Sequence, residues 1–386
     1  MSSPLVARMQ PFGTTIFAEM SALAARTGSI NLGQGFPDTD GPQSMLDAAK
    51  AAIDAGRNQY PPGPGVPELL QAIADHQDRF YGLRLDPTSE VLVTVGATEA
   101  IASVILALCE PGDEVVTFEP YYDSYAATIA LAGATRRTSV LRFPDFAIDE
   151  VSLRAAFSER TRIVLLNTPH NPTGKVFTRA ELELIASLAQ EHDAWVVTDE
   201  VYEHLVFDGA PHIPMATLPG MAARTITISS AGKTFSATGW KVGWLTGPAE
   251  AVTAARTVKQ FLTYVGSGPF QPAVAHALGL GDDVYAGLAS SLERKRDLLC
   301  DALAAAGLTV SRPAGTYFVI ADAALLGATD GLEFARSLPE LAGVVGIPVS
   351  VFHDDVDAAR TLIRFAFCKR DEVLVEASRR LAGLRP

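Results

Sequence analysis

The chain has 386 residues, of which 48% are hydrophobic and 19% charged, so it can bury a large core and is not intrinsically disordered. Its formal net charge of −13 at pH 7 argues against nucleic acid or an anionic membrane surface as a partner. The three cysteines form no CxxC pair, and neither a membrane-length apolar run nor a signal-peptide core is present, so we expect a cytoplasmic protein without a zinc site or a disulfide framework.

The segment before Val91 predicts an arm, helices and a loop. Residues 4–30 read as an arm that contains a helix over residues 14–26, capped by its first residue, Thr14. Another helix is expected over residues 43–55. The Pro/Gly-rich segment 58–67 predicts a loop, and its last proline opens a further helix.

From Val91 onward, predicted strands and helices alternate. The strand segments are β-branched or apolar and do not alternate with polar residues in the regular way of a half-buried strand, which is typical of a sheet that is covered on both faces. The alternation predicts an α/β domain with a mainly parallel sheet. The predicted strands are Val91–Val95, Glu114–Phe118, Ile163–Leu166, Trp195–Thr198, Thr225–Ile228 and Val242–Thr246, and the helices between them include Glu99–Leu108, Ser124–Leu131 and Arg179–Glu191.

The C-terminal part shows a different pattern, typical of a smaller α+β domain. We expect the N-terminal arm to join this domain, which makes it discontinuous in sequence. The expected division is 1–42 for the arm and part of the small domain, 43–282 for the large domain and 283–386 for the rest of the small domain. The predicted elements are helices over 249–264, 283–306, 332–338 and 371–381, and strands over 317–320 and 362–367.

Lys233 is the strongest candidate for covalent chemistry. It follows a predicted strand and lies among small and apolar residues, where desolvation lowers the pKa of a lysine and frees its amine to attack a carbonyl. Ser230 and Lys241 are close in sequence and suit a phosphate group. Pyridoxal 5′-phosphate (PLP) is an aldehyde cofactor that carries a phosphate, so we expect Lys233 to hold it as a Schiff base. The alternative is a surface loop with two solvated lysines.

Other polar residues fall at the ends of predicted strands, where open α/β sheets bind ligands. The segment Gly96–Glu99 begins a helix and suits a phosphate, although Thr98 could be a simple N-cap. Asp199 could keep a pyridine nitrogen protonated and so make the ring an electron sink, with Tyr202 nearby. A capping aspartate and a core tyrosine are the alternative.

Three further positions have both a structural and a functional explanation. Asn171 lies between two prolines, in a turn that could aim its amide at a ligand or be an ordinary turn. Tyr121 and Tyr122 follow a strand, and either ring could stack on a flat cofactor or belong to the core. Arg364, inside an apolar strand, needs a partner, which could be a substrate α-carboxylate or an internal salt bridge.

Several motifs of other enzyme classes are missing from the sequence. The seven histidines make no HExxH or other metal spacing, so we expect no metal. Gly33-Gln34-Gly35 lacks the further glycine of a dinucleotide fingerprint, and no GxSxG elbow occurs. Hydrolase and dehydrogenase activities therefore have no support.

In this order, the candidate residues resemble the class I/II aminotransferases of PLP fold type I, most closely the kynurenine, methionine and N-succinyldiaminopimelate aminotransferase group. The resemblance covers essentially the whole chain. It implies an α/β fold with a large domain built on a mainly parallel, seven-stranded type of sheet and a smaller discontinuous α+β domain. The matching segments are Asn31–Pro37, Asn58–Tyr60, Asn171–Gly174, Asp199–Tyr202, Ser230–Gly243 and Arg364–Phe365.

The resemblance implies a homodimer and particular residue roles. Lys233 would hold the cofactor and shuttle the proton, and Asp199 and Tyr202 would complete the catalytic group. In the cofactor site, Ala97, Thr98, Ser230 and Lys241 would bind the phosphate together with Tyr60 from the other subunit, Tyr122 would stack on the ring, and Asn171 and Tyr202 would bind the phenolic oxygen. In the substrate site, Gly35, Asn171 and Arg364 would bind the carboxylate, with Phe17 and Tyr264 beside the side chain.

Some positions depart from the relatives. Lys241 stands where many members of the wider class have arginine, which weakens bidentate phosphate contact without abolishing binding. Thr98 replaces a bulky aromatic residue of the kynurenine enzymes, Phe17 a tryptophan, and Tyr264-Val265 a Phe-His pair. These differences argue against a kynurenine preference.

We therefore expect transfer of an amino group from an L-amino acid to 2-oxoglutarate or pyruvate, by a ping-pong route through pyridoxamine phosphate. The expected donors are methionine, glutamine, aromatic amino acids or N-succinyldiaminopimelate, and Lys259 and Arg26 are candidate cations for a succinyl carboxylate. A cysteine-S-conjugate β-lyase needs the same lysine and carboxylate clamp and is an alternative. A non-enzymatic PLP sensor is another, although the acidic charge opposes a DNA-linked role.

Overall fold

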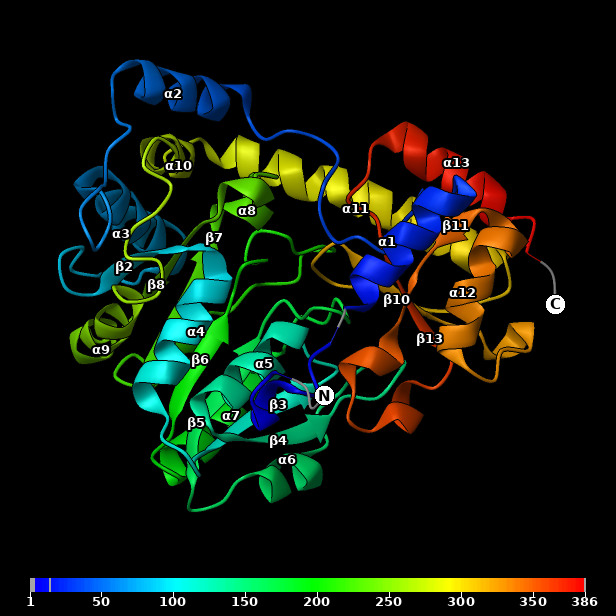
Figure 1. The fold of residues 1–386 in the computed structure, drawn as a ribbon, viewed down its shortest axis with the longest axis horizontal. Coiled ribbons are helices and arrows are strands. Elements are labelled where there is room, and N and C mark those ends of the chain that lie inside the picture. Colours follow the sequence, from blue (N-terminus) through cyan, green and yellow to red (C-terminus); the bar gives the residue numbers. More distant parts are fainter. Residues whose placement is uncertain (1–3, 14, 385–386) are drawn as a thin grey trace.

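A seven-stranded sheet forms the centre of the fold in the computed structural model, which describes residues 4–13 and 15–384 (Figure 1). The strand order is β2-β8-β7-β6-β5-β3-β4, and only β8 runs antiparallel to its neighbours. The predicted, mainly parallel α/β sheet is thus confirmed. Its strands are β2 (Val91–Val95), β3 (Glu114–Glu119), β4 (Thr135–Val140), β5 (Thr161–Asn167), β6 (Trp195–Asp199), β7 (Thr225–Ser230) and β8 (Val242–Thr246).

The edge strand β4 is the strand of this sheet that the sequence analysis missed. It pairs only with β3. Its sequence Thr-Arg-Arg-Thr-Ser-Val is mostly polar, and only Ser139 is buried. Edge strands with one solvated face do not form the apolar runs by which the central strands were recognised.

Helices cover both faces of the sheet because alternate side chains of each strand point to opposite sides. In β5, Ile163 and Leu165 join one core cluster with residues of α4 and α9, while Val164 and Leu166 join a second cluster with residues of α7. The helices α4 (Gly96–Leu108), α5 (Asp123–Ala132), α6 (Glu150–Ala156), α7 (Arg179–Glu191) and α9 (Ala249–Lys259) contribute to these layers.

A third core cluster involves helices at the β2 edge of the sheet. These are α2 (Gln43–Asp54), α3 (Pro67–Tyr81) and α10 (Phe270–Leu278), of which α10 was not predicted. The predicted helix 249–264 was too long, since α9 ends at Lys259 and Tyr264 has a φ of +65° that no right-handed helix allows. The rest of that segment forms turns.

The second part of the fold is built on an antiparallel sheet with the order β12-β13-β10-β9. The N-terminal segment lies with it, because β1 (Ile30–Asn31) pairs with β11 (Val344–Val345) and α1 contacts α12. The N-terminal segment thus packs on the C-terminal part of the chain. The elements are α1 (Ile16–Thr27), α11 (Asp282–Ala305), β9 (Thr309–Ser311), β10 (Phe318–Asp322), α12 (Gly331–Ala342), β12 (Ile347–Pro348), β13 (Leu362–Ala366) and α13 (Asp371–Leu381).

Two details concern the start of the chain and the membrane. Thr15 occupies the N-cap position of α1, whereas the predicted cap, Thr14, lies outside the described residues. No helix within the described part of the chain is long and apolar enough to cross a membrane.

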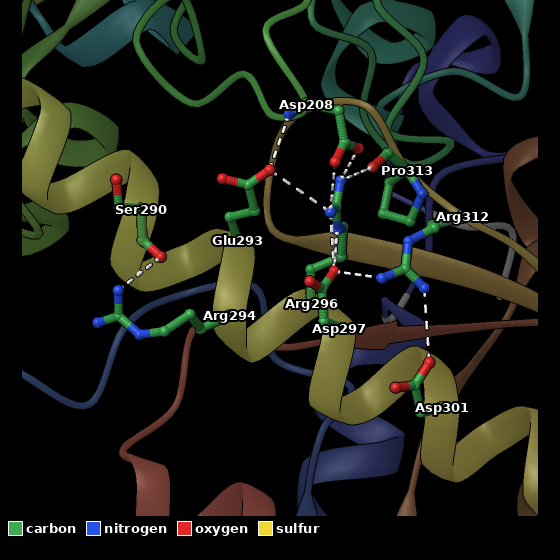
Figure 2. Close-up of polar contacts among 9 residues, drawn as sticks. All are labelled: Asp208, Ser290, Glu293, Arg294, Arg296, Asp297, Asp301, Arg312 and Pro313. Carbon is green, nitrogen blue, oxygen red and sulfur yellow. Dashed lines mark hydrogen bonds and ion pairs between the residues drawn. The ribbon is translucent and has the colours of Figure 1, made fainter.

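The long helix α11 is fastened to the loop after β6 by a buried arginine (Figure 2). The side chain of Arg296 is 1% exposed, and its guanidinium donates to Asp208, to Asp297 at 2.7 Å and to the carbonyl of Pro313 at 3.2 Å. Arg312 also contacts Asp297. Three acceptors around one guanidinium satisfy a charge that would otherwise be costly to bury.

Candidate active site

A cavity of about 280 Å³ lies where β5, β6 and β7 end, at the carboxyl edge of the parallel strands. This is the place where open α/β sheets bind ligands. Twelve of the predicted site residues line it: Phe17, Gly35, Ala97, Thr98, Tyr122, Asn171, Asp199, Tyr202, Ser230, Lys233, Lys241 and Arg364.

Lys233 faces this cavity from the short helix α8 (Ala231–Thr234) that follows β7, and among the described residues its amine forms no ion pair. Its Nζ lies 5.8 Å from the ring centres of both Tyr202 and Tyr317. Burial lowers the pKa of Lys233, and the nearby cations Lys241 and Arg364 lower it further. Cys368 and Asp199 act in the opposite direction and raise it, but the pKa stays below its usual value. An amine with a lowered pKa is a better nucleophile at neutral pH. The alternative of two solvated lysines fails for Lys233, which is half-buried, whereas Lys241 is exposed.

Asp199 ends β6 and is buried at the base of the cavity. Its carboxylate accepts a hydrogen bond from the Tyr125 hydroxyl at 2.7 Å and one from the backbone N–H of Val201 at 3.3 Å. Burial raises the pKa of Asp199 to about 6, although the Tyr125 hydrogen bond opposes the shift. A buried carboxylate of this kind favours a cationic partner, and a protonated pyridine nitrogen would supply one.

A cradle of backbone N–H groups lies at the start of α4, on the wall of the cavity. Gly96 has a φ of +74°, and a Cβ on it would come 3.1 Å from Nζ of Lys241. The helix N-terminus supplies free N–H groups, and Ser230 and Thr98 also line this part of the cavity. Thr98 does not cap α4, because the N-cap is Val95, so that alternative is wrong.

Arg364 lies on β13 and reaches the cavity from the second sheet. It is 2% exposed and donates to the carbonyl of Gly33 at 3.0 Å and to Oδ1 of Asn171 at 3.2 Å. Within the described chain no carboxylate forms an ion pair with it and its Nε has no partner, so the internal salt bridge is wrong. Burial lowers the pKa of Arg364 to about 10, which leaves it charged at neutral pH and able to bind a carboxylate.

Two predicted residues lie outside the cavity. Tyr60 is 82% exposed and Tyr264 is 50% exposed, and their rings meet edge to face with centres 5.6 Å apart. The candidate succinyl-binding cations do not line it either. Lys259 is buried and donates to the carbonyl of Gly63 at 2.9 Å, so its role is structural, while Arg26 is exposed on α1.

The sequence analysis missed several residues of the site. Asn167 joins two loops, because its amide donates to the carbonyl of Asp199 at 2.8 Å and its oxygen accepts the N–H of Asn171 at 2.7 Å. Its position just after a predicted strand was a usable signal. Tyr125 and Tyr317 gave no such signal, since their partners, Asp199 and the carbonyl of Gly35, are remote in sequence.

A cluster of His76, Glu203 and His204 lies outside the cavity, with its ligand-type atoms within 4.8 Å of one another. The two imidazoles bond to each other at 2.7 Å, and Glu203 accepts the Ser229 hydroxyl at 2.6 Å. We interpret it as a buried hydrogen-bond network. No local spacing indicated it, because His76 belongs to α3 and the other two follow β6.

Comparison with known proteins identifies the class of this protein. Residues 27–381 match the family described as aminotransferase class I and II, so the chain belongs to that family. It is a PLP-dependent transaminase of fold type I, which moves an amino group between an amino acid and a 2-oxo acid. The groups that line the cavity fit the cofactor, since the cradle at Gly96, the carboxylate of Asp199 and the amine of Lys233 face the same space.

Particular relatives are similar over nearly the whole chain. A probable N-succinyldiaminopimelate aminotransferase of Mycobacterium tuberculosis is 54% identical over 390 residues, which cover 98% of each chain. The solved structure of N-succinyldiaminopimelate aminotransferase from that organism superposes with a TM-score of 0.96 over 99% of this chain and 100% of the other. The methionine aminotransferase of Escherichia coli is 40% identical over 385 residues, 99% of this chain and 100% of that protein.

Proposed function

We propose that the residues around the cavity divide the transamination as their positions suggest. PLP supplies an electron sink when it is bound. Lys233 would hold the cofactor aldehyde and afterwards carry the substrate proton, and Asp199 would keep the ring nitrogen protonated. Arg364 would bind the α-carboxylate with Asn171 beside it. The observation that supports this division most strongly is that Lys233 and Arg364 face one cavity without a carboxylate partner among the described residues.

For the remaining residues, the proposed roles follow their positions on the cavity wall. Tyr122 would stack on the cofactor ring, and Tyr202 would donate its hydroxyl to the phenolic oxygen. Ala97, Thr98, Ser230 and Lys241 would bind the phosphate. Phe17 and Gly35 would lie beside the substrate.

The amino donor we propose is N-succinyldiaminopimelate, with methionine as a poorer donor. The support is the 54% identity to the probable N-succinyldiaminopimelate aminotransferase and the 40% identity to the methionine enzyme. Among the described residues, the only cations that line the cavity are Lys233, Lys241 and Arg364. A long donor would therefore extend its succinyl group beyond the cavity.

A panel of donors tests this proposal. With 2-oxoglutarate as acceptor, N-succinyldiaminopimelate should give the highest kcat/KM, about tenfold or more above methionine, which corresponds to about 1.4 kcal/mol of additional transition-state stabilisation. Glutamine, phenylalanine, kynurenine, alanine and valine complete the panel. A preference for alanine or valine, with the long donors inert, would show that the proposed substrate class is wrong.

We further propose that the active unit is a homodimer in which Tyr60 and Tyr264 complete the partner's cavity. Both are exposed large side chains outside the cavity of their own chain, and Phe261 and Leu262 extend this surface. Exposed apolar residues gathered in one place are typical of an interface.

The proposed cytoplasmic location is supported by the three cysteines Cys109, Cys300 and Cys368, which are buried and free.

Subunit complementation should reveal this exchange. A mixture of Lys233→Ala and Tyr60→Ala chains, refolded or co-expressed, should regain activity, because each mixed dimer has one cavity with both residues intact. About a quarter of the wild-type activity is expected for random pairing, since about half of the dimers are mixed and each has one working site. Activity no higher than the average of the two separate variants, or a fully active monomer in sedimentation, would contradict the proposal.

A further inference from the structure

A group of contacts outside the cavity joins the two sheets at the end of β3. Glu119, the last residue of β3, is 1% exposed. Its Oε2 accepts the backbone N–H groups of Asp354 and Asp355, each at 3.0 Å, and lies 3.3 Å from Nδ1 of His353. One buried carboxylate thus binds three consecutive residues of the segment that leads into β13.

The neighbours of Glu119 strengthen this junction. The N–H of Tyr121 donates to the carbonyl of Phe352 at 3.0 Å, and the Tyr121 hydroxyl donates to Asp354 at 2.9 Å. Arg136 of β4 reaches both oxygens of Asp354, at 2.5 and 2.7 Å, and its guanidinium lies 4.4 Å from the centre of the Tyr121 ring. In Figure 1 the orange turns before β13 lie beside β3 and β4.

The segment held in this way carries Phe352, which lies behind the proposed carboxylate site. Phe352 ends the 3-10 helix Val349–Phe352 and is 2% exposed. Its ring centre is 5.2 Å from the guanidinium carbon of Arg364 and 5.9 Å from the ring of Phe17, which lines the cavity. A shift of Phe352 would therefore change the packing around both residues.

We propose that Glu119 is a positioning residue for the substrate carboxylate: by binding the N–H groups of Asp354 and Asp355, it holds Phe352 against Arg364 and Phe17. Glu119 does not line the cavity itself. The inference rests on the proposed role of Arg364 as the carboxylate anchor. Its physical basis is that an ionised acceptor makes stronger hydrogen bonds than a neutral one, and that its removal leaves the N–H groups of Asp354 and Asp355 without this partner.

The ionisation of Glu119 is consistent with this task. Burial acts to raise the pKa of this carboxyl, but the nearby side chains of His353 and Thr138 and the N–H of Asp355 outweigh burial and hold the pKa at about 2. The group is thus a carboxylate throughout the neutral range, in which the contacts are strongest.

The test measures steady-state kinetics of the PLP-loaded enzyme with Glu119→Ala and Glu119→Gln. In Glu119→Ala, KM for both the amino donor and the 2-oxo acid should rise about tenfold, because both carboxylates would bind Arg364. The kcat at saturation and the affinity for PLP should change by less than about threefold. Glu119→Gln keeps one acceptor oxygen, so its KM values should lie close to those of the wild type.

Two further variants separate positioning from stability. Arg296→Met removes the buried contacts of Arg296 with Asp208 and Asp297 that Figure 2 shows, which lie away from Glu119. It should therefore lower Tm and leave KM unchanged. Arg136→Gln loosens the same junction from a partly exposed position and should raise KM about threefold, which keeps the proposal testable if Glu119→Ala does not fold.

Specific outcomes would overturn the proposal. An unchanged KM in folded Glu119→Ala, or in Arg136→Gln if Glu119→Ala does not fold, would show that the junction only stabilises the fold. An equal rise of KM in Arg296→Met would show the same. If an Arg364 variant raises KM while Glu119→Ala does not, the positioning role alone is wrong, and if neither does, the carboxylate site itself is wrong.

Discussion

Replacing Lys233 by alanine should lower kcat by on the order of 10⁴-fold or more, because one side chain would lose both its link to the cofactor and the proton transfer. Lys233 is the amine at the end of β7 that faces the cavity with a lowered pKa and no ion pair among the described residues. Absorbance spectra of the purified variant should lack the visible band of lysine-bound cofactor, and kcat is measured with donor and acceptor both saturating.

A second lysine provides the control. Lys295 of α11 forms an ion pair with Asp371 at 3.5 Å and does not line the main cavity. Lys295→Ala should therefore keep both the absorbance band and the turnover. Wild-type turnover in Lys233→Ala, or an equal loss in both variants, would exclude the assignment of Lys233.

Arg364→Met should lower kcat/KM for donor and acceptor by about 10²- to 10³-fold, within the 2–5 kcal/mol expected for loss of a buried charge pair. The main effect should be on KM, because the carboxylate is bound in the ground state and in the transition state alike. Steady-state kinetics with both substrates measure it. Arg360→Met is a suitable control, since Arg360 is exposed and pairs with Asp357.

The melting temperature of Arg364→Met provides a second test of the role of Arg364. A buried cation without an ion pair costs free energy in the empty enzyme, and methionine has a similar volume, so the Tm of Arg364→Met should equal or exceed that of the wild type. A clear loss of Tm without a change in KM would indicate a structural arginine instead of a carboxylate anchor.

The sequence predicts most strands of the seven-stranded sheet well because their signal is local. Segments such as Val91–Val95 and Val242–Thr246 are mostly apolar, and their bounds agree with β2 and β8. Residues directly after such strands, among them Asp199 and Lys233, could be recognised as site candidates, because parallel strands bring their carboxyl ends to one edge.

Features that depend on partners remote in sequence could not be predicted. The Tyr125 hydroxyl donates a hydrogen bond to Asp199, which lies 74 residues further along the chain. Glu119 directly follows the predicted strand Glu114–Phe118, but its partners could not be predicted, since its role arises only when the segment before β13 folds against β3. Lys259 was a candidate cation for the succinyl group, but its amine donates a hydrogen bond to the carbonyl of Gly63.

The most direct test of the account is a half-reaction without acceptor. PLP-loaded enzyme is mixed with an excess of the amino donor, and the 2-oxo acid released is counted by mass spectrometry. The account predicts about one equivalent of 2-oxo acid per subunit, after which the reaction stops until a second 2-oxo acid removes the amino group from the cofactor. Absence of 2-oxo acid would contradict it, as would continuous release of pyruvate and a thiol from a cysteine conjugate without any acceptor.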